Sequence, residues 1–264
     1  MKWPAEVVIV RHGESTYNAL KGQKENDPLY QHFKAKYKEV SDWGVLLPQD
    51  LVNLANEIGQ KFSLGVSDYD TPMTAKGEEQ AVQTGEDLQK FIALPDVIFV
   101  SPFLRTRQTL DFMTKGWPEL ARVKTYSEER IREKSPGLTG LYNDWRIFNV
   151  FHPEQKRYRD LYGELADYWY TYPNGENIPQ ARDRIRSWVT TLIREFAGKR
   201  VLAVTHHLTI LAVRAQLERL SPEEFIRLDR QEKPVNCGVT IYRGDPAQGE
   251  DGRLVLAVYN QKLC

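Results

Sequence analysis

The chain has 264 residues, 41% of them hydrophobic, which is enough for one large domain with a sizeable buried core. Lys plus Arg and Asp plus Glu number 36 each, so the formal net charge is zero and gives no general attraction to nucleic acid or to an anionic membrane. The apolar runs are far shorter than the roughly 20 residues of a membrane span, so we expect neither a membrane nor a nucleic-acid partner.

Short runs of β-branched residues predict buried strands, and helical patterns lie between them. The predicted strands cover 6–10, 97–100, 201–205, 239–242 and 254–259. The predicted helices cover 75–91, 105–115, 178–196 and 208–220. Strands that alternate with helices are typical of an α/β fold, so we expect a three-layer α/β/α sandwich with a mostly parallel central sheet.

Two stretches depart from this alternation. Residues 19–69 are rich in Lys, Glu, Gln, Asp and Tyr, and residues 141–175 are rich in Trp, Tyr and Phe. No repeat, low-complexity tract or Gly/Ser/Pro linker marks a domain boundary, so we expect one domain over 1–264 with two inserted segments. The aromatic segment either roofs a pocket or is a packed helical subdomain. The 19–69 segment either covers a site or mediates dimer contacts, and the sequence leaves the oligomeric state open, a homodimer included.

The cysteines and histidines argue against a disulfide framework and a metal site. Cys237 and Cys264 have no C-x-x-C spacing, as in proteins of a reducing compartment. The five histidines show no H-x-x-x-H or H-E-x-x-H spacing. The first residues, MKWPAEVVIVRHGE, hold no apolar stretch of secretory length. We therefore expect a cytoplasmic protein that uses no metal and no cofactor.

Polar side chains follow three of the predicted strands at the point where each strand ends. Arg11-His12 follows the first strand, Ser101-Pro102 the second and His206-His207 the third along the chain. Ligands of open α/β sheets bind beyond the carboxyl ends of the strands, so these groups are expected to meet at one edge. For each of them, a structural or solvated side chain is the alternative interpretation.

The residue types around these positions suit an anion. Arg11 carries a fixed cation whose fork matches phosphate oxygens. Gly13 lets the backbone turn sharply and approach a ligand, and Ser15 and Asn18 add short polar groups. Arg105 falls at the start of a predicted helix, and a helix N-terminus attracts anions. Together they indicate a phosphate site.

Three segments together resemble the phosphate pocket of the histidine phosphatase superfamily, also called the phosphoglycerate mutase-like family. They are R-H-G-E-S-T-Y-N at 11–18, S-P-F-L-R-T-R-Q-T at 101–109 and T-H-H at 205–207, in the family's order. The resemblance implies that His12 is the nucleophile and forms a phosphohistidine, while Arg11, Arg105 and His206 hold the phosphoryl oxygens. Gly13, Ser15, Asn18 and His207 are the further phosphate contacts we expect, and arginines take the place of a metal.

The resemblance also implies a general acid. The segment I-R-E-K-S-P-G-L-T-G at 131–140 resembles the family's E-x-x-x-G pattern through Glu133 and Gly137. Glu133 is therefore expected to protonate the leaving group. Glu128 and Glu129 compete for this role, and a solvated turn is the other interpretation of all three glutamates.

Two departures from the family pattern bear on function. His207 stands where the family usually has glycine, so it tolerates the same backbone geometry, adds a donor to the pocket, or is itself the functional histidine in place of His206. We prefer His206 for this role, because it ends V-T-H at the end of the strand. The acid segment that reads E-R-H-Y-G in the mutases reads E-K-S-P-G here, which favours a phosphatase. The sequence therefore predicts hydrolysis of a small-molecule phosphomonoester. A phosphoglycerate mutase-type transfer and a catalytically silent phosphate-binding protein are the alternatives.

Overall fold

The computed structural model describes residues 2–44 and 46–263, so Cys264 lies outside the described residues. Contacts divide the chain into two compact units. The sheet unit comprises Met1–Ser15, Tyr69–Glu133 and Gln180–Cys264, and the helical unit comprises Thr16–Asp68 and Lys134–Pro179. Among the described residues, no helix has both the length and the apolar character needed to span a bilayer. The expected organisation of one domain with two insertions stays a prediction.

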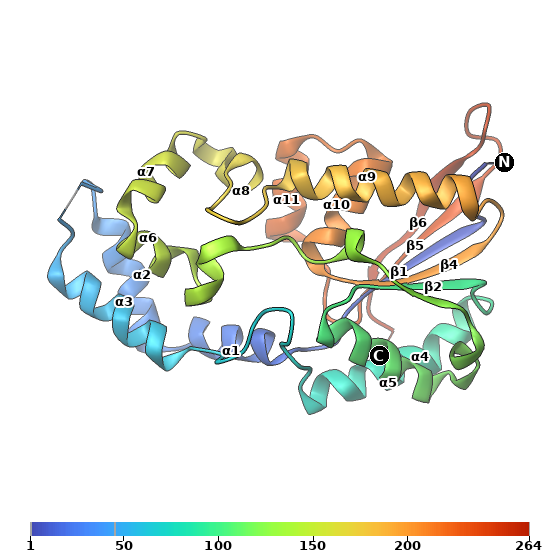
Figure 1. Ribbon diagram of the computed structural model, residues 1–264, viewed down its shortest axis with the longest axis horizontal. Helices are drawn as coiled ribbons and strands as arrows, with labels where there is room; N and C mark the ends of the chain where they lie inside the picture. The colour runs from blue at the N-terminus through green and yellow to red at the C-terminus, as the bar shows by residue number, and fades with distance from the viewer. Residues whose placement is uncertain (1, 45, 264) are drawn as a thin grey trace. The chain divides into compact units, whose positions relative to one another are not determined.

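A mixed sheet of six strands, in the order β3-β2-β4-β1-β5-β6, forms the centre of the sheet unit in the described part of the chain (Figure 1). The strands are β1 (Glu6–Arg11), β2 (Val97–Val100), β3 (Thr125–Ser127), β4 (Arg200–Thr205), β5 (Val239–Asp245) and β6 (Arg253–Gln261). β1 to β4 run parallel, β5 runs antiparallel to β1, and β6 runs antiparallel to β5. Since Arg11 pairs with Thr205 and Val100 with Val204, three strand ends lie at one edge.

Helices cover both faces of this sheet (Figure 1). One face packs on α9 (Ile178–Glu195) and α10 (His207–Glu218), and the other on α4 (Ala75–Phe91) and α5 (Leu104–Gly116). Side chains of a strand alternate between the faces, so in β1 Val7 and Ile9 join the first core and Val8 and Val10 the second. The predicted three-layer α/β/α sandwich is confirmed, as are its four helices.

Several elements of the sheet unit are not predicted from the sequence. β3 is the three-residue stretch T-Y-S, whose Thr125 and Ser127 are exposed, so it carries no apolar run. α11 (Pro222–Gln231) begins with a capping box in which the Ser221 and Glu224 side chains bind each other's backbone N–H. Two short 3₁₀ turns complete the unit, η1 (Pro118–Arg122) and η2 (Glu129–Ile131).

The helical unit is made of the two stretches that interrupt the strand and helix alternation. Its elements are α1 (Thr16–Glu25), α2 (Pro28–Glu39), α3 (Gln49–Lys61), η3 (Gly137–Tyr142), α6 (Trp145–Phe151), α7 (Pro153–Asp160), η4 (Gly163–Leu165) and α8 (Ala166–Trp169). Both stretches contribute to one core, which contains Tyr30, Phe33 and Trp43 from the first and Ile147 and Val150 from the second. The aromatic segment therefore packs within a helical subdomain, and its contact with a substrate stays a prediction.

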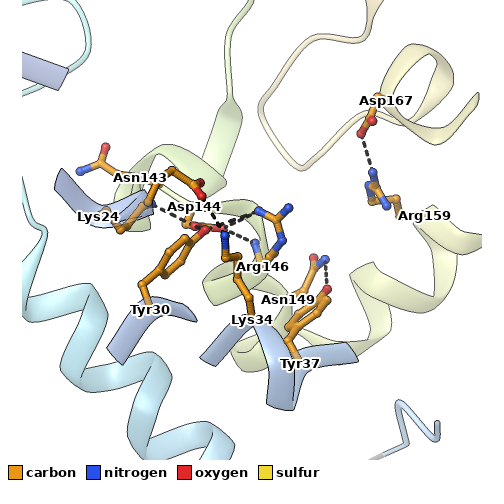
Figure 2. Close-up of polar contacts among 11 residues, drawn as sticks. Lys24, Tyr30, Lys34, Tyr37, Asn143, Asp144, Arg146, Asn149, Arg159 and Asp167 are labelled. Carbon is orange, nitrogen blue, oxygen red and sulfur yellow. Dashed lines mark hydrogen bonds and ion pairs between the residues drawn. The ribbon is translucent and has the colours of Figure 1, made fainter. Parts of the chain in front are cut away.

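A buried ion pair joins the two stretches of the helical unit (Figure 2). Lys24 Nζ lies 3.0 Å from Asp144 Oδ2, and the two side chains are 5% and 3% exposed. Asp144 also accepts a hydrogen bond from the Tyr30 hydroxyl and caps α6 through the Arg146 N–H at 2.8 Å. Burial works in the opposite direction, but the charge of Lys24 and these hydrogen bonds keep the pKa of Asp144 below its usual value. Asp144 is thus a charged group with partners on both stretches.

Candidate active site

The structure brings the polar residues at the strand ends together in the sheet unit. His12 directly follows β1, and the register of β1 on β4 pairs Arg11 with Thr205, the residue before His206. The imidazole rings of His12 and His206 meet edge to face, with their centroids 5.3 Å apart. The charges of Arg11 and Arg105 act on both rings. Two histidines and two arginines therefore share one edge of the sheet.

A backbone contact fixes the tautomer of His12. Its Nδ1–H donates to the carbonyl oxygen of Gly13 at 2.7 Å, which leaves the lone pair on Nε2. Burial, and then the charges of Arg105 and Arg11, hold the pKa of His12 well below its usual value. The ring is therefore neutral at neutral pH, and Nε2 has the properties of a nucleophile.

His206 is fully buried and has one ring nitrogen paired. Its Nε2 lies 2.7 Å from the Ser101 hydroxyl, while its Nδ1 has no hydrogen-bond partner among the residues that the structure describes. Burial, followed by the charge of Arg105, keeps the pKa of His206 well below its usual value. When Ser101 donates to Nε2, Nδ1 carries the hydrogen and is a donor without a protein acceptor. Such a buried donor is a candidate contact for a ligand.

Arg11 is held by a backbone carbonyl and keeps a second donor unused. Its Nη1 donates to the carbonyl oxygen of Pro234 at 2.7 Å, and its buried Nε has no hydrogen-bond partner within residues 2–44 and 46–263. Burial lowers the pKa of Arg11 to about 10, with the nearby Glu133 acting in the opposite direction and Arg105 in the same direction. Arg11 is thus cationic at neutral pH, and its Nε–H is a candidate donor to an anion.

Arg105 lies in the first turn of α5. Its guanidinium carbon stands 4.9 Å from the centre of the Phe103 ring, and the side chain is buried. Phe103 also packs on His206, with the ring centroids 5.0 Å apart. No group of three or more His, Cys, Asp or Glu in the described ranges is arranged to hold a metal ion. The positive charge at this edge comes from arginines and from the start of α5.

Gly13 and Ser15 make contacts within the protein. The Gly13 N–H donates to Thr109 Oγ1 at 3.0 Å, and a Cβ on Gly13 would lie 2.5 Å from the carbonyl oxygen of Gly77. A close approach of two backbone segments therefore requires glycine here. Ser15 is buried and forms an isolated bridge with Met73. Phosphate contacts by Gly13 and Ser15 stay predictions, as does the role of Asn18, which lies on α1 in the helical unit.

Glu133 follows η2 along the chain, and its carboxylate contacts the first turn of α10. Its Oε2 accepts the N–H of Leu208 at 3.3 Å, and its charge raises the pKa of Arg11. Glu128, one of its competitors, is instead bound at two points by Arg130, whose Nε and Nη2 lie 2.9 and 2.7 Å from the carboxylate oxygens. This pairing supports a structural interpretation of Glu128. Glu133 is the glutamate of the three for which the structure gives a contact beside His206.

His207 occupies the first position of α10, next to His206. Its Nε2 lies 2.7 Å from Asp229 Oδ1 on α11. A charge on His207 lowers the pKa of His12, so the two rings are close enough to interact electrostatically. Asp229 thus fixes one nitrogen of His207, and a contact of the other with phosphate stays a prediction.

Sequence reasoning missed the segment that holds the end of β1. Asn236 Nδ2 donates to the carbonyl oxygen of His12 at 3.0 Å, and the Cys237 N–H donates to that of Arg11 at 3.1 Å. Cys237 has a φ of 56°, in the left-handed region that a side chain such as cysteine rarely adopts. These contacts are made to backbone carbonyls, which every residue has, so no sequence pattern predicts them.

The sequence profile of the histidine phosphatase superfamily (branch 1) matches residues 63–254. The chain is 27% identical over 231 residues to a 2,3-bisphosphoglycerate-dependent phosphoglycerate mutase of Bifidobacterium longum, an alignment that covers 73% of this chain and 90% of that protein. It is 25% identical over 182 residues to a phosphoglycerate mutase-like protein, AT74H, of Arabidopsis thaliana, and spans only 61% of the length of that relative, with 61% of this chain aligned.

Among solved structures, a mycobacterial glucosyl-3-phosphoglycerate phosphatase in complex with inorganic phosphate superposes with a TM-score of 0.60 at 18% identity, covering 98% of each chain. At this identity the likeness concerns the fold alone. The segment 11–18 lies ahead of the range that the profile matches, and the pairing of β1 with β4 brings Arg11 beside the matched part of the chain.

Proposed function

The chain belongs to branch 1 of the histidine phosphatase superfamily, and we propose that it hydrolyses phosphomonoesters through a phosphohistidine on His12. The observation that carries the proposal is the state of His12. Its ring is buried and neutral, its tautomer is fixed through Gly13, and Arg11 and Arg105 lie within electrostatic reach. A neutral imidazole beside two fixed cations suits attack on a phosphoryl group whose charge the cations offset.

In the first step His12 Nε2 attacks phosphorus while the bond from phosphorus to the ester oxygen breaks. Glu133, as the general acid, gives its proton to the leaving oxygen. Arg11 through Nε, Arg105, and His206 through Nδ1 bind the phosphoryl oxygens, because preorganised donors stabilise the charge of the transition state. Gly13, Ser15, Asn18 and His207 are the additional phosphate contacts that we propose.

In the second step a water molecule attacks phosphorus of the phosphohistidine. The Glu133 carboxylate takes a proton from this water, the bond between phosphorus and His12 Nε2 breaks, and inorganic phosphate leaves. The cations and ring nitrogens that stabilise the first transition state also serve the second. No metal or other cofactor takes part in either step of the proposed reaction, since arginines meet the phosphoryl charge.

The substrate we propose is a small-molecule phosphomonoester, and the cytoplasm is the compartment we propose. Two observations support hydrolysis. A mycobacterial protein with the same fold is named as a phosphatase, and the acid segment reads E-K-S-P-G rather than the E-R-H-Y-G of the mutases. A phosphoglycerate mutase-type transfer is the second candidate, because the mutase of Bifidobacterium longum aligns over 90% of its length. A silent binding protein is the third, which loss of turnover on removal of His12 would exclude.

Phosphate release from 4-nitrophenyl phosphate in the presence of a chelator tests the proposal. We expect turnover in the wild type, none in His12→Ala and slower turnover in Glu133→Ala. Turnover that stops when the chelator is added would refute the metal-independent reaction. Absence of release from the wild type, combined with interconversion of phosphoglycerates, would favour the mutase.

A further inference from the structure

We propose that two buried threonines, Thr205 and Thr209, are positioning residues that hold Glu133 at a fixed distance from the phosphoryl pocket. Thr205 lies in the T-H-H segment, but neither threonine has a role in the reaction proposed above. The inference rests on the proposed function, because it concerns the glutamate assigned there as general acid. It adds the residues that set the distance between the Glu133 carboxylate and the ester oxygen that it protonates.

Three consecutive residues, 131–133, are each held by one group from the stretch 205–209. Thr205 Oγ1 donates to the carbonyl oxygen of Ile131 at 2.6 Å, and Thr209 Oγ1 donates to that of Arg132 at 2.7 Å. The third contact is the hydrogen bond from the Leu208 N–H to the Glu133 carboxylate at 3.3 Å. Both threonines are 1% exposed, so water does not compete for their hydroxyls. The backbone that carries the acid is thus tied down on the two residues before it.

The stretch that holds Glu133 is also the stretch that carries His206. Thr205 ends β4, an inner strand that pairs with β1 and β2, and Thr209 lies in the first turn of α10. His206 lies between them, and its Nδ1 has no hydrogen-bond partner in the part of the chain that the structure describes. A shift of the 131–133 backbone would therefore change the distance between the acid and a phosphoryl group bound by His206. Displacements of about 1 Å cost up to about 100-fold in rate when a reacting group must be aligned.

A purely structural interpretation is that each hydroxyl only satisfies its own hydrogen-bonding need. The two interpretations differ in what the loss of a hydroxyl does. Ile131 is fully buried in the core on the α9 and α10 face, so its side chain keeps the segment attached when a threonine is changed. The carboxylate of Glu133 then moves slightly while the protein stays folded. A displaced acid slows esters with weakly acidic leaving groups most, since these need the proton, whereas a general loss of packing slows all esters alike.

The test compares the rate of phosphoenzyme formation, measured by rapid quench, for 4-nitrophenyl, phenyl and 4-methoxyphenyl phosphate. Thr205→Val and Thr209→Val remove the hydroxyls at nearly constant shape, and the two Thr→Ser variants restore them. Thr84→Val is the matched control, because Thr84 is also buried in the sheet unit and its hydroxyl donates to the carbonyl oxygen of Gln80 at 2.8 Å, within α4. Thermal unfolding of each variant gives the change in stability.

We expect each Thr→Val change to slow the 4-methoxyphenyl ester about 10-fold or more and the 4-nitrophenyl ester by no more than about threefold, with recovery in the Ser variants. Equal slowing of all three esters, or the same profile in Thr84→Val, would overturn the positioning role and leave the proposed function intact. Absence of His12-dependent phosphate release from wild type on every ester would overturn the proposed function, and the positioning role with it.

Discussion

The imidazole rings of His12 and His206 meet edge to face with their centroids 5.3 Å apart, and each ring has one nitrogen fixed by the protein. Gly13 fixes Nδ1 of His12, and Ser101 fixes Nε2 of His206. Burial keeps both rings neutral, so their remaining nitrogens differ in role rather than in charge. In the proposed reaction, the remaining nitrogen of His12 is the nucleophile and that of His206 is a hydrogen-bond donor.

The stability of the protein is expected to fall as the pH drops from 7 to 5, because of these two histidines. Burial lowers the pKa of each below the ordinary value of 6.5, so the unfolded chain takes up protons that the folded protein does not. Below about pH 6.5, the free energy of unfolding then falls by about 1.4 kcal/mol per pH unit for each histidine. Urea unfolding at pH 7, 6 and 5 measures this slope. The His206→Gln variant should show about half the contribution, and an unchanged slope in that variant would contradict the assignment.

Replacing Arg11 by lysine is expected to impair turnover although the charge is kept. Lysine has neither the Nη1 that binds the Pro234 carbonyl nor the Nε–H that we propose binds a phosphoryl oxygen, and it cannot replace a forked contact. We expect kcat/KM for 4-nitrophenyl phosphate to fall about 100-fold. Arg107→Lys is the control, since Arg107 is exposed on α5, and it should stay within about twofold of wild type. An equal fall in kcat/KM for Arg11→Lys and Arg107→Lys would show that turnover does not depend on the specific contacts of Arg11.

The ion pair of the helical unit is expected to be sensitive to the loss of one partner. Lys24→Met leaves the carboxylate of Asp144 buried without its cation and should lower the free energy of unfolding by about 3–5 kcal/mol. Adding Asp144→Asn should recover part of this loss, because asparagine removes the charge and still caps α6. Lys90→Met breaks an exposed pair with Asp87 and should leave the free energy of unfolding nearly unchanged, because water screens the pair. Urea unfolding compares the three, and similar losses for Lys24 and Lys90 would contradict the argument.

How far the sequence predicts the fold depends on how each element is stabilised. Residues 7–10 and 201–204 are runs of buried aliphatic residues, because the sheet is covered on both faces, and such runs predict strands from the sequence. β3 is short, and two of its three residues are exposed, so nothing in T-Y-S distinguishes it from a turn. α11 and α2 begin with readable caps, S-P-E-E and D-P, that lie in polar surroundings and are easily taken for loops.

Some residues of the candidate site can likewise be predicted from the sequence, and others cannot. His12 and His206 stand directly after strands, and Arg105 lies in the first turn of the helix that follows β2, so the topology of an α/β sheet predicts that they meet. Thr205, Thr209 and Asn236 act through hydrogen bonds to backbone carbonyls distant in sequence, such as Ile131 and His12. Every residue offers such a carbonyl, so only the folded chain reveals which one is used.

The central claim is that a covalent phosphohistidine forms on His12. Wild type and His12→Ala, mixed with 4-nitrophenyl phosphate and quenched in alkali within milliseconds, can be digested and analysed by mass spectrometry. The account predicts one phosphoryl group, labile to acid, on Nε2 of His12 in the wild type and none in the variant. Phosphate release by wild type with no phosphoryl group on His12 at any quench time, or with the group on another side chain, would contradict it.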